Sequence, residues 1–412
     1  MLLTRKFAIT PTEEQEQVLW ELSNLCRQIY NMALFERRFL SQNYGVMPSY
    51  IDQQNALPAL KTYLPQYKQV YSKALRGALR KLDAAYKAYF GLLKQGEKTV
   101  KPPGFRGRKY FFTLCYNQHG FQFTSQTIKL SHKHTNKVKL IFSAPFDFTP
   151  YQVKQVELFQ DHVTKKYYVA VIYEMQEPIY QDNRLYQAFD LGMMKHVAIN
   201  TAGKFLESKV KRPDKHWQSK IQSLQQRRDH CKKGSRRWRK LHQRLVTVER
   251  KCRNQTLDWQ HKQALQLLQN TKANTIIVGQ LSVKRMTQTK QTSSNKKAQK
   301  GLHRAVQNTG HLARFVELLT YKAQKLGKKV IVIDERNTSK TCCLCGKKQD
   351  MPLHKRIFDC ECGNRMDRDQ NSAVNIMVRF LSRHAPRVGY QQFVDKLRYT
   401  ANHKTKVSLV FG

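Results

Sequence analysis

The stretch Val330–Gly346, "VIVIDERNTSKTCCLCG", joins a run of aliphatic residues to a pair of cysteines. With the two lysines before it, the run reads "KKVIVID", which predicts a buried β-strand that ends next to Glu335. A carboxylate at the end of a strand can be a surface charge, a strand-end cap or the ligand of a metal ion. The rest of the sequence has to distinguish these three roles.

The composition of the chain favours a polyanionic partner. Its 412 residues suffice for two to four domains, and 74 Lys and Arg against 29 Asp and Glu give a formal net charge of +45. Nucleic acid neutralises such an excess and releases its own counterions in doing so. No apolar run approaches the roughly 18 residues that cross a bilayer, and no signal peptide is visible, so we expect an intracellular protein without a membrane partner.

The cysteines are grouped as zinc ligands are. The two close pairs are Cys342 with Cys345 and Cys360 with Cys362. Gly346 and Gly363 follow the second cysteine of each pair, where a knuckle turn needs positive φ. This spacing predicts one structural Zn²⁺ held by four thiolates in a closed site. Cys343 lies inside the first knuckle and is expected to point away from the metal.

A second kind of metal site requires acids at the ends of separate segments. Hydrolysis of a phosphodiester with two Mg²⁺ ions needs carboxylates that converge from different strands. Asp190 ends the strand-like "QAFD", and Asp367 and Asp369 precede an amphipathic helix. Each of the latter two can also serve simply as a helix N-cap.

Two basic stretches are candidate nucleic-acid surfaces. In the first, Arg106, Arg108 and Lys109 interleave with aromatic residues, a pattern that suits phosphate pairing and base stacking. The second is a basic helical hairpin that turns near Gly234. Its candidate phosphate contacts are Arg227, Arg228, Arg236 and Arg237.

Residues 11–96 are mainly helical in pattern. Thr10 and Glu13 predict a capping box for a helix with Pro11 at its first position. Pro and Gly then interrupt the pattern at 102–107, and short alternating segments up to about Glu174 predict a small β-domain.

Four segments, taken in order, resemble the TnpB proteins, which are transposon-encoded RNA-guided DNA endonucleases related to the type V CRISPR effectors. They are "FDLGMMKHVAINTAGK" (189–204), "IIVGQLSVKRM" (276–286), "NTSKTCCLCG…CECG" (337–363) and "MDRDQNSAVNI" (366–376). The resemblance extends over nearly the whole chain.

The resemblance implies a multidomain α+β fold. The expected parts are a wedge-like β-barrel (1–10 and 97–182), a helical recognition lobe (11–96), an RNase H-like (RuvC) α/β nuclease domain with an inserted helical hairpin (183–335 and 367–385), a zinc-ribbon lobe (336–366) and a basic C-terminal tail (386–412).

The resemblance also implies the catalytic acids. Asp190 matches the first and Asp369 the last, whereas Gly279 stands where most relatives carry the middle Glu. Some TnpB proteins and their Fanzor relatives carry a Glu just before the zinc knuckle instead, and here that residue is Glu335. Asp190, Glu335 and Asp369 would then bind two Mg²⁺ ions.

Three functions follow as hypotheses. The first is an RNA-guided endonuclease that carries a guide RNA from the transposon end and cuts double-stranded target DNA beside a short flanking motif. The second is a nuclease-dead repressor, suggested by the loss of the usual Glu. The third is a strand-transfer enzyme that works without RNA. For each we expect a cytoplasmic, nucleoid-associated protein of a bacterium or archaeon.

Overall fold

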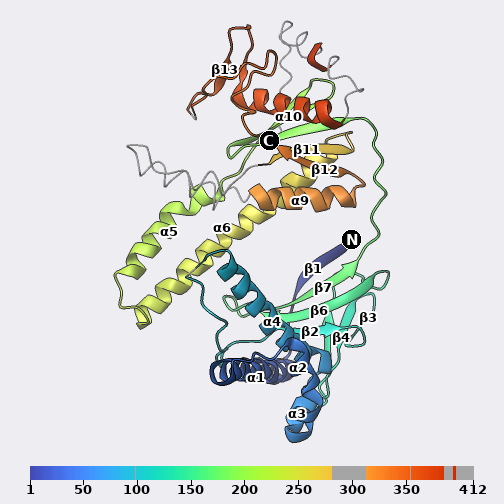
Figure 1. Cartoon of the computed structure of the whole chain (residues 1–412). Helices are drawn as coiled ribbons and strands as arrows, with labels where there is room; N and C mark the ends of the chain where they lie inside the picture. Colours follow the sequence, from blue (N-terminus) through green and yellow to red (C-terminus); the bar gives the residue numbers. More distant parts are fainter. Residues whose placement is uncertain (98, 281–311, 353, 385–392, 396–412) are drawn as a thin grey trace. The chain divides into compact units, whose positions relative to one another are not determined.

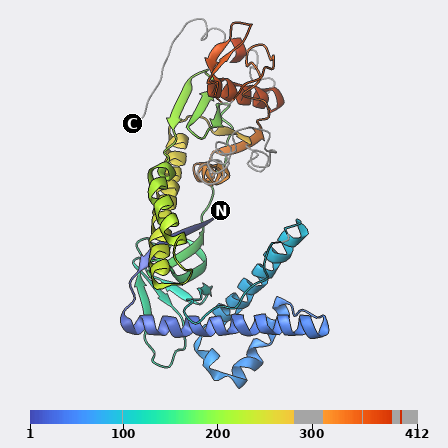
Figure 2. The same ribbon diagram turned by 90° about the vertical axis from the view of Figure 1, so that its left-hand side faces the viewer.

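The computed structural model describes all residues except 98, 281–311, 353, 385–392 and 396–412 (Figures 1 and 2). The chain divides into two units, residues 1–176 and 177–412. The predicted basic tail lies outside the described residues apart from 393–395, and the finer domain boundaries stay a prediction. No described helix combines the length and apolar character needed to cross a membrane.

The helices of the first unit pack around a long amphipathic helix. They are α1 (Glu13–Tyr44), α2 (Tyr50–Asn55), α3 (Leu57–Tyr63), the 3-10 turn η1 (Pro65–Gln69) and α4 (Ser72–Lys94). One stripe of α1, including Leu22 and Ile29, meets Leu75 and Leu82 of α4 in a common core, as helical periodicity predicts.

Helix α1 begins two residues later than the sequence pattern predicts. Thr12 is the N-cap: its hydroxyl accepts from the backbone N–H of Gln15, whose side chain accepts in return from the N–H of Thr12. The predicted pair of Thr10 and Glu13 is therefore wrong. Both pairs have threonine followed three residues later by an acidic or amide residue, and β1 runs to Ile9, which leaves Thr10 too close to the strand to cap.

The strands of the first unit form two sheets that share the core of α1. One has the order β1 (Leu2–Ile9), β7 (Tyr167–Glu174), β6 (Gln152–Gln160), β2 (Leu114–Asn117). The other has the order β3 (Phe121–Phe123), β4 (Thr127–Leu130), β5 (Leu140–Ser143). Among the described residues no pairing joins them, so the predicted closed barrel is not found. Instead, residues such as Ile128 and Val156 bury one face of each sheet against the other.

The second unit is a mixed sheet covered on both faces (Figure 1). Its order is β10 (Phe205–Lys209), β9 (Lys195–Asn200), β8 (Tyr186–Leu191), β11 (Thr275–Gln280), β12 (Lys329–Asp334), with β8, β11 and β12 parallel. Helix α10 (Arg368–His384) covers one face, and α6 (Arg236–Gln269) and α9 (Leu312–Lys325) cover the other. Alternate residues of β11 serve the two cores, with Ile277 toward α10 and Ile276 toward α9.

The position of β12 differs from the prediction. It was expected to be a buried strand, yet it is the outer strand of the sheet, and Val332 is 45% exposed. A central and an outer parallel strand can have the same sequence pattern, because both carry consecutive β-branched residues.

Two appendages extend from this sheet. Helix α5 (Pro213–Asp229) and the first half of α6 run side by side in both views, joined near Gly234, and share a small apolar core around Leu224 and Leu245 (Figures 1 and 2). The short hairpin of β13 (Ile357–Asp359) and β14 (Arg365–Asp367) leads directly into α10.

The observed cap of α1 can be tested locally. Thr12→Ala removes the acceptor for the Gln15 N–H, and loss of such a cap costs about 1 kcal/mol. We expect roughly fivefold faster hydrogen–deuterium exchange in the first turn of α1. Thr10→Ala is the matched control and is expected to leave exchange unchanged. Faster exchange with Thr10→Ala alone would contradict the assignment of the cap.

Candidate metal centres

The three predicted acids lie at one edge of the second unit. Asp190 is the penultimate residue of β8, Glu335 directly follows β12, and Asp369 lies in the first turn of α10. Strands β8 and β12 flank β11 and run parallel to it, so their carboxyl ends meet at the same edge. That edge is where ligands bind in open α/β sheets.

The charges of these acids act on one another at Asp190. Its residue keeps some surface, but its carboxyl group lies deep in the protein. Burial is the main cause that raises the pKa of Asp190 from 3.8 to about 7, and the charges of Asp369 and Glu335 raise it further. A hydrogen bond between this carboxyl group and the Ser372 side chain acts in the opposite direction. The three acids therefore form one electrostatic cluster.

Glu335 and Asp369 are perturbed in the same direction. Burial and the neighbouring Asp334 raise the pKa of Glu335 from 4.5 to about 7, against the opposing charge of Arg379. Burial is also the first cause of the raised pKa of Asp369. A divalent cation would relieve this repulsion, and hard oxygen donors are the ligands that Mg²⁺ prefers, so the residues present fit such an ion.

The carboxylate oxygens of the three acids lie farther apart than the ligand atoms of a single metal ion. Within the described parts of the chain, only the four-cysteine set brings three or more ligand atoms within 4.8 Å of one another. The oxygens of Asp190, Glu335 and Asp369 are thus not all that close together. Two ions held roughly 4 Å apart need a wider ligand set than one ion does.

Asp367 and Asp369 have different roles. The Asp367 Oδ1 accepts from the backbone N–H of Asp369 at 2.8 Å and from that of Gln370 at 3.3 Å. Its Oδ2 pairs with Lys195 at 3.0 Å. The sequence allows either aspartate to be the N-cap of α10, and the structure assigns this role to Asp367. The side chain of Asp369 is not used for capping.

Three buried polar residues of α10, Asn371, Ser372 and Asn375, which we call the polar strip, hold the segment between Glu335 and the first zinc knuckle. The Asn375 Nδ2 donates to the carbonyls of Thr338 at 2.8 Å and Thr341 at 2.7 Å. The Asn371 Nδ2 donates to the same two carbonyls, and its Oδ1 accepts from the N–H of Cys343 at 3.0 Å. The buried amides thus satisfy backbone groups that a buried loop would otherwise leave unpaired.

The strip also reaches both strand-borne acids. The Ser372 hydroxyl, which is hydrogen-bonded to Asp190, lies 2.9 Å from the Thr338 hydroxyl. The backbone N–H and hydroxyl of Thr338 contact the Glu335 carbonyl at 3.1 and 2.9 Å. From the next turns of α10, Arg379 donates to the carbonyls of Asp334 and Arg336. The backbone around Glu335 is therefore fixed from two directions.

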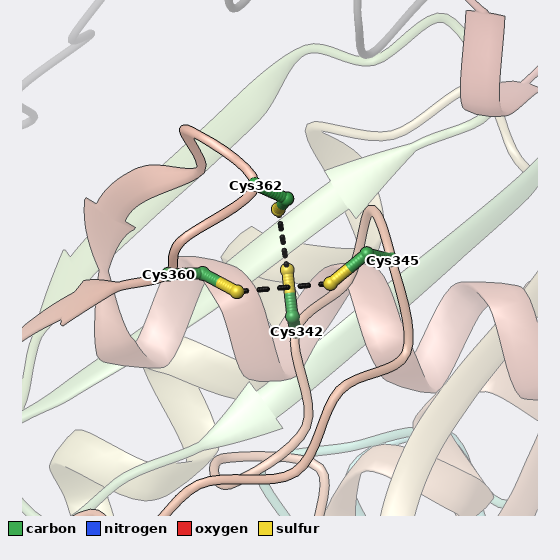
Figure 3. Close-up of side chains that lie close together, drawn as sticks. All are labelled: Cys342, Cys345, Cys360 and Cys362. Carbon is green, nitrogen blue, oxygen red and sulfur yellow. Dashed lines mark hydrogen bonds between the residues drawn. The ribbon is translucent and has the colours of Figure 1, made fainter.

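The four predicted zinc ligands converge, as Figure 3 shows. The sulfurs of Cys342 and Cys362 are 3.6 Å apart, as are those of Cys345 and Cys360. Four sulfurs at ~2.3 Å from one tetrahedral ion lie about 3.8 Å apart, so the set fits Zn²⁺. Burial tends to raise the pKa of Cys342, but N–H donors from Cys345, Leu344 and Asn364 outweigh it and lower the pKa to about 7.

Cys343 points away from this cluster. Its sulfur lies 3.7 Å from the Met366 Sδ in the core beneath α10, and burial raises its pKa to about 12. It is thus a buried thiol, in line with the prediction from sequence.

The predicted nucleic-acid residues lie on the surfaces of separate units. In the first unit Arg106, Arg108 and Lys109 are exposed, and Arg106 stacks over the rings of Tyr30 and Tyr110. In the second unit the four hairpin arginines flank the α5–α6 turn. Arg227, Arg236 and Arg237 are exposed, whereas Arg228 is half-buried and pairs with Asp229.

The polar strip is what sequence reasoning missed. Asn371 and Asn375 are four residues apart, so both amides lie on the face of α10 that also buries Ile376 and Phe380. Two amides on the apolar face of a predicted helix are a signal of a buried polar network, because amides are seldom buried without partners.

Comparisons with known proteins define the class. The family model "Cas12f1-like, TNB domain" matches residues 313–376, and a "Helix-turn-helix domain" model matches residues 1–42. The fold is shared with a solved Cas12f1–sgRNA–target DNA complex, at a TM-score of 0.57 and 14% identity over 89% of this chain and 83% of that one. The chain therefore shares the mixed α/β fold of that Cas12f1 protein.

Curated relatives narrow this class. A Streptomyces pristinaespiralis protein named "Putative RNA-guided DNA endonuclease" is 25% identical over 92% of this chain and 90% of its own length. A "TnpB-like protein" of Acanthamoeba polyphaga mimivirus is 34% identical over 35% of this chain and 26% of its own length. The family models and these relatives show that the chain is similar to TnpB proteins.

The assignment of the zinc ligands predicts a metal content. Cys342→Ser and Cys360→Ser each leave three thiolates, and we expect either variant to lose its zinc, measured by inductively coupled plasma mass spectrometry of the purified protein. Cys343→Ser is the matched control from the same knuckle and is expected to keep about one zinc per chain. Full zinc retention by Cys360→Ser would contradict the site.

The raised pKa of Asp190 predicts how stability depends on pH. Between about pH 4 and the native value of about 7, the folded protein holds a proton that the unfolded chain has released. Rising pH therefore destabilises the magnesium-free protein, by on the order of 2 kcal/mol after allowing for partial exposure. We expect Asp190→Asn to lose less thermal stability than the wild type between about pH 5 and pH 8. Parallel melting profiles for the two proteins would contradict the perturbation.

Proposed function

We propose that this protein is an RNA-guided DNA endonuclease, cytoplasmic and associated with the nucleoid, that hydrolyses target DNA next to a short flanking motif. The observation that carries the proposal is the electrostatic cluster of Asp190, Glu335 and Asp369 at the carboxyl edge of the sheet. Strongly perturbed acids at such an edge are typical of a functional site. The name of the Streptomyces relative supports the same function, as do the sgRNA and target DNA held in the Cas12f1 complex.

The three acids would act as ligands of two Mg²⁺ ions in a RuvC-type centre. When bound, the ions supply Lewis-acid stabilisation of the phosphate and activate the attacking water. The chain itself places the acids: Ser372 orients Asp190, Thr338 and Arg379 hold the backbone at Glu335, and Asp367 caps the helix that presents Asp369. The carboxylates must be ionised to bind, and proton release at Asp190 and Glu335 is centred near pH 7.

The remaining surfaces would hold the nucleic acids. The exposed arginines and lysine before β2 combine charge with aromatic rings, which favours a role in the wedge-like recognition of DNA or RNA. The basic α5–α6 hairpin offers guanidinium groups to a phosphate backbone. The zinc lobe is a closed structural site and would do no chemistry of its own.

The decisive experiment is cleavage by the complex of protein and copurified RNA. We expect a plasmid that carries a matching target to be cut in the presence of Mg²⁺ and not after addition of EDTA. RNA-specified binding without any cut would instead support the nuclease-dead repressor. Activity that survives RNase treatment during assembly would support the strand-transfer enzyme.

Substitution of Glu335 tests the site. Glu335→Gln keeps the shape of the side chain but removes the negative ligand, so we expect cleavage to fall at least ~100-fold while guide-RNA affinity is unchanged. The matched control is Asp334→Asn: this neighbouring acid is exposed and accepts from the Arg336 N–H, which asparagine can also do. Wild-type cleavage by Glu335→Gln would remove Glu335 from the catalytic set.

A further inference from the structure

Gly279 is a buried glycine near the end of β11 whose backbone does not require glycine. It pairs with Ile333 in the parallel ladder to β12, and its φ lies outside the left-handed region. Any residue could adopt this conformation, and glycine weakens a strand because it adds entropy to the unfolded chain and packs nothing. The reason for glycine must therefore lie in the space around it.

That space is occupied by Glu335. A Cβ placed on Gly279 would lie 2.9 Å from the Cβ of Glu335 and still nearer its Oε2, both closer than real Cβ contacts allow. The next neighbour, the Ile376 Cδ1 of α10, would be at 3.1 Å. Two of the three nearest atoms thus belong to the acid proposed as a metal ligand, and the third is the flexible end of a core side chain.

The backbone at Glu335 has no room to withdraw. Thr338 binds its carbonyl twice, and Arg379 binds the carbonyls on either side of it. A methyl group at position 279 would therefore turn the Glu335 carboxylate away, and its contact with the Glu335 Cβ would strain the backbone that these bonds hold.

We propose that Gly279 is a positioning residue: by lacking a side chain it opens a niche that accepts one carboxylate, and Glu335 fills that niche from the turn after β12. The inference rests on the proposed function, since it concerns the same acid. It adds that the niche can be filled from either neighbouring strand segment, but not from both together. A side chain that starts at Gly279 begins beside the present Glu335 oxygen, so aspartate, with its carboxyl carbon one bond beyond Cβ, has the right length.

The test exchanges the glycine and the acid and measures affinity for Mn²⁺ alone as well as DNA cleavage. We expect Gly279→Ala and Glu335→Gly each to weaken Mn²⁺ binding at least about tenfold, measured by isothermal titration calorimetry on the zinc-loaded protein. The double variant Gly279→Asp/Glu335→Gly removes both close contacts and restores a carboxylate. It should bind Mn²⁺ at least about tenfold more tightly than its uncharged control, Gly279→Asn/Glu335→Gly, and regain cleavage.

Three outcomes distinguish the positioning role of Gly279 from its alternatives. Wild-type Mn²⁺ affinity and cleavage in a folded Gly279→Ala protein would overturn the proposal, and so would equal affinities for the two double variants. If Gly279→Ala does not fold, as judged by thermal melting, the comparison of the double variants decides alone. A wild-type protein that binds Mn²⁺ in a Glu335-dependent way but does not cut DNA would contradict the proposed function. It would not contradict the positioning role of Gly279.

Discussion

The second unit depends on a set of hydrogen bonds from one helix to one loop. The carboxamides of Asn371 and Asn375 bind the carbonyls of Thr338 and Thr341, and no water is needed to satisfy these buried groups. A half-satisfied network in this position would be costly, because unpaired polar groups in a low-dielectric interior lose several kcal/mol. The loop between Glu335 and the zinc knuckle is therefore held in one conformation.

This network connects the two candidate metal centres. The helix that presents Asp369 also holds the first knuckle, through the bond from the Cys343 N–H to Asn371. The same helix reaches Asp190 through Ser372. Asn364, at the second knuckle, lies within 3.3 Å of the Cys342 sulfur and 3.4 Å of Asn371. The four-cysteine lobe and the placement of the acids thus depend on the same residues, so a metal bound by the cysteines would also help to order the acid site.

The sequence predicted features that depend on local spacing. Four cysteines in two close pairs lead to one cluster, and an aspartate that ends a strand-like run, Asp190, lies at the carboxyl edge of the sheet. It did not predict features set by neighbours distant in the chain. β12 carries the aliphatic pattern of a buried strand, but its place at the edge follows from the order of the other four strands. The two sheets of the first unit and the cap at Thr12 likewise depend on pairings that periodicity does not encode.

The charge of the whole chain and the charge of the three acids have opposite effects on a nucleic acid. A net charge of +45 attracts a polyanion to the surface, yet Asp190, Glu335 and Asp369 would repel a phosphate once ionised. Burial is the first cause of their raised pKa values, and neighbouring acids raise them further. A divalent cation, as the proposed function requires, would resolve both conflicts, because it would stabilise the ionised acids and give the phosphate an attractive partner. In the proposed function, burial, which makes the ionised acids costly without a cation, would therefore also make the approach of DNA depend on the metal.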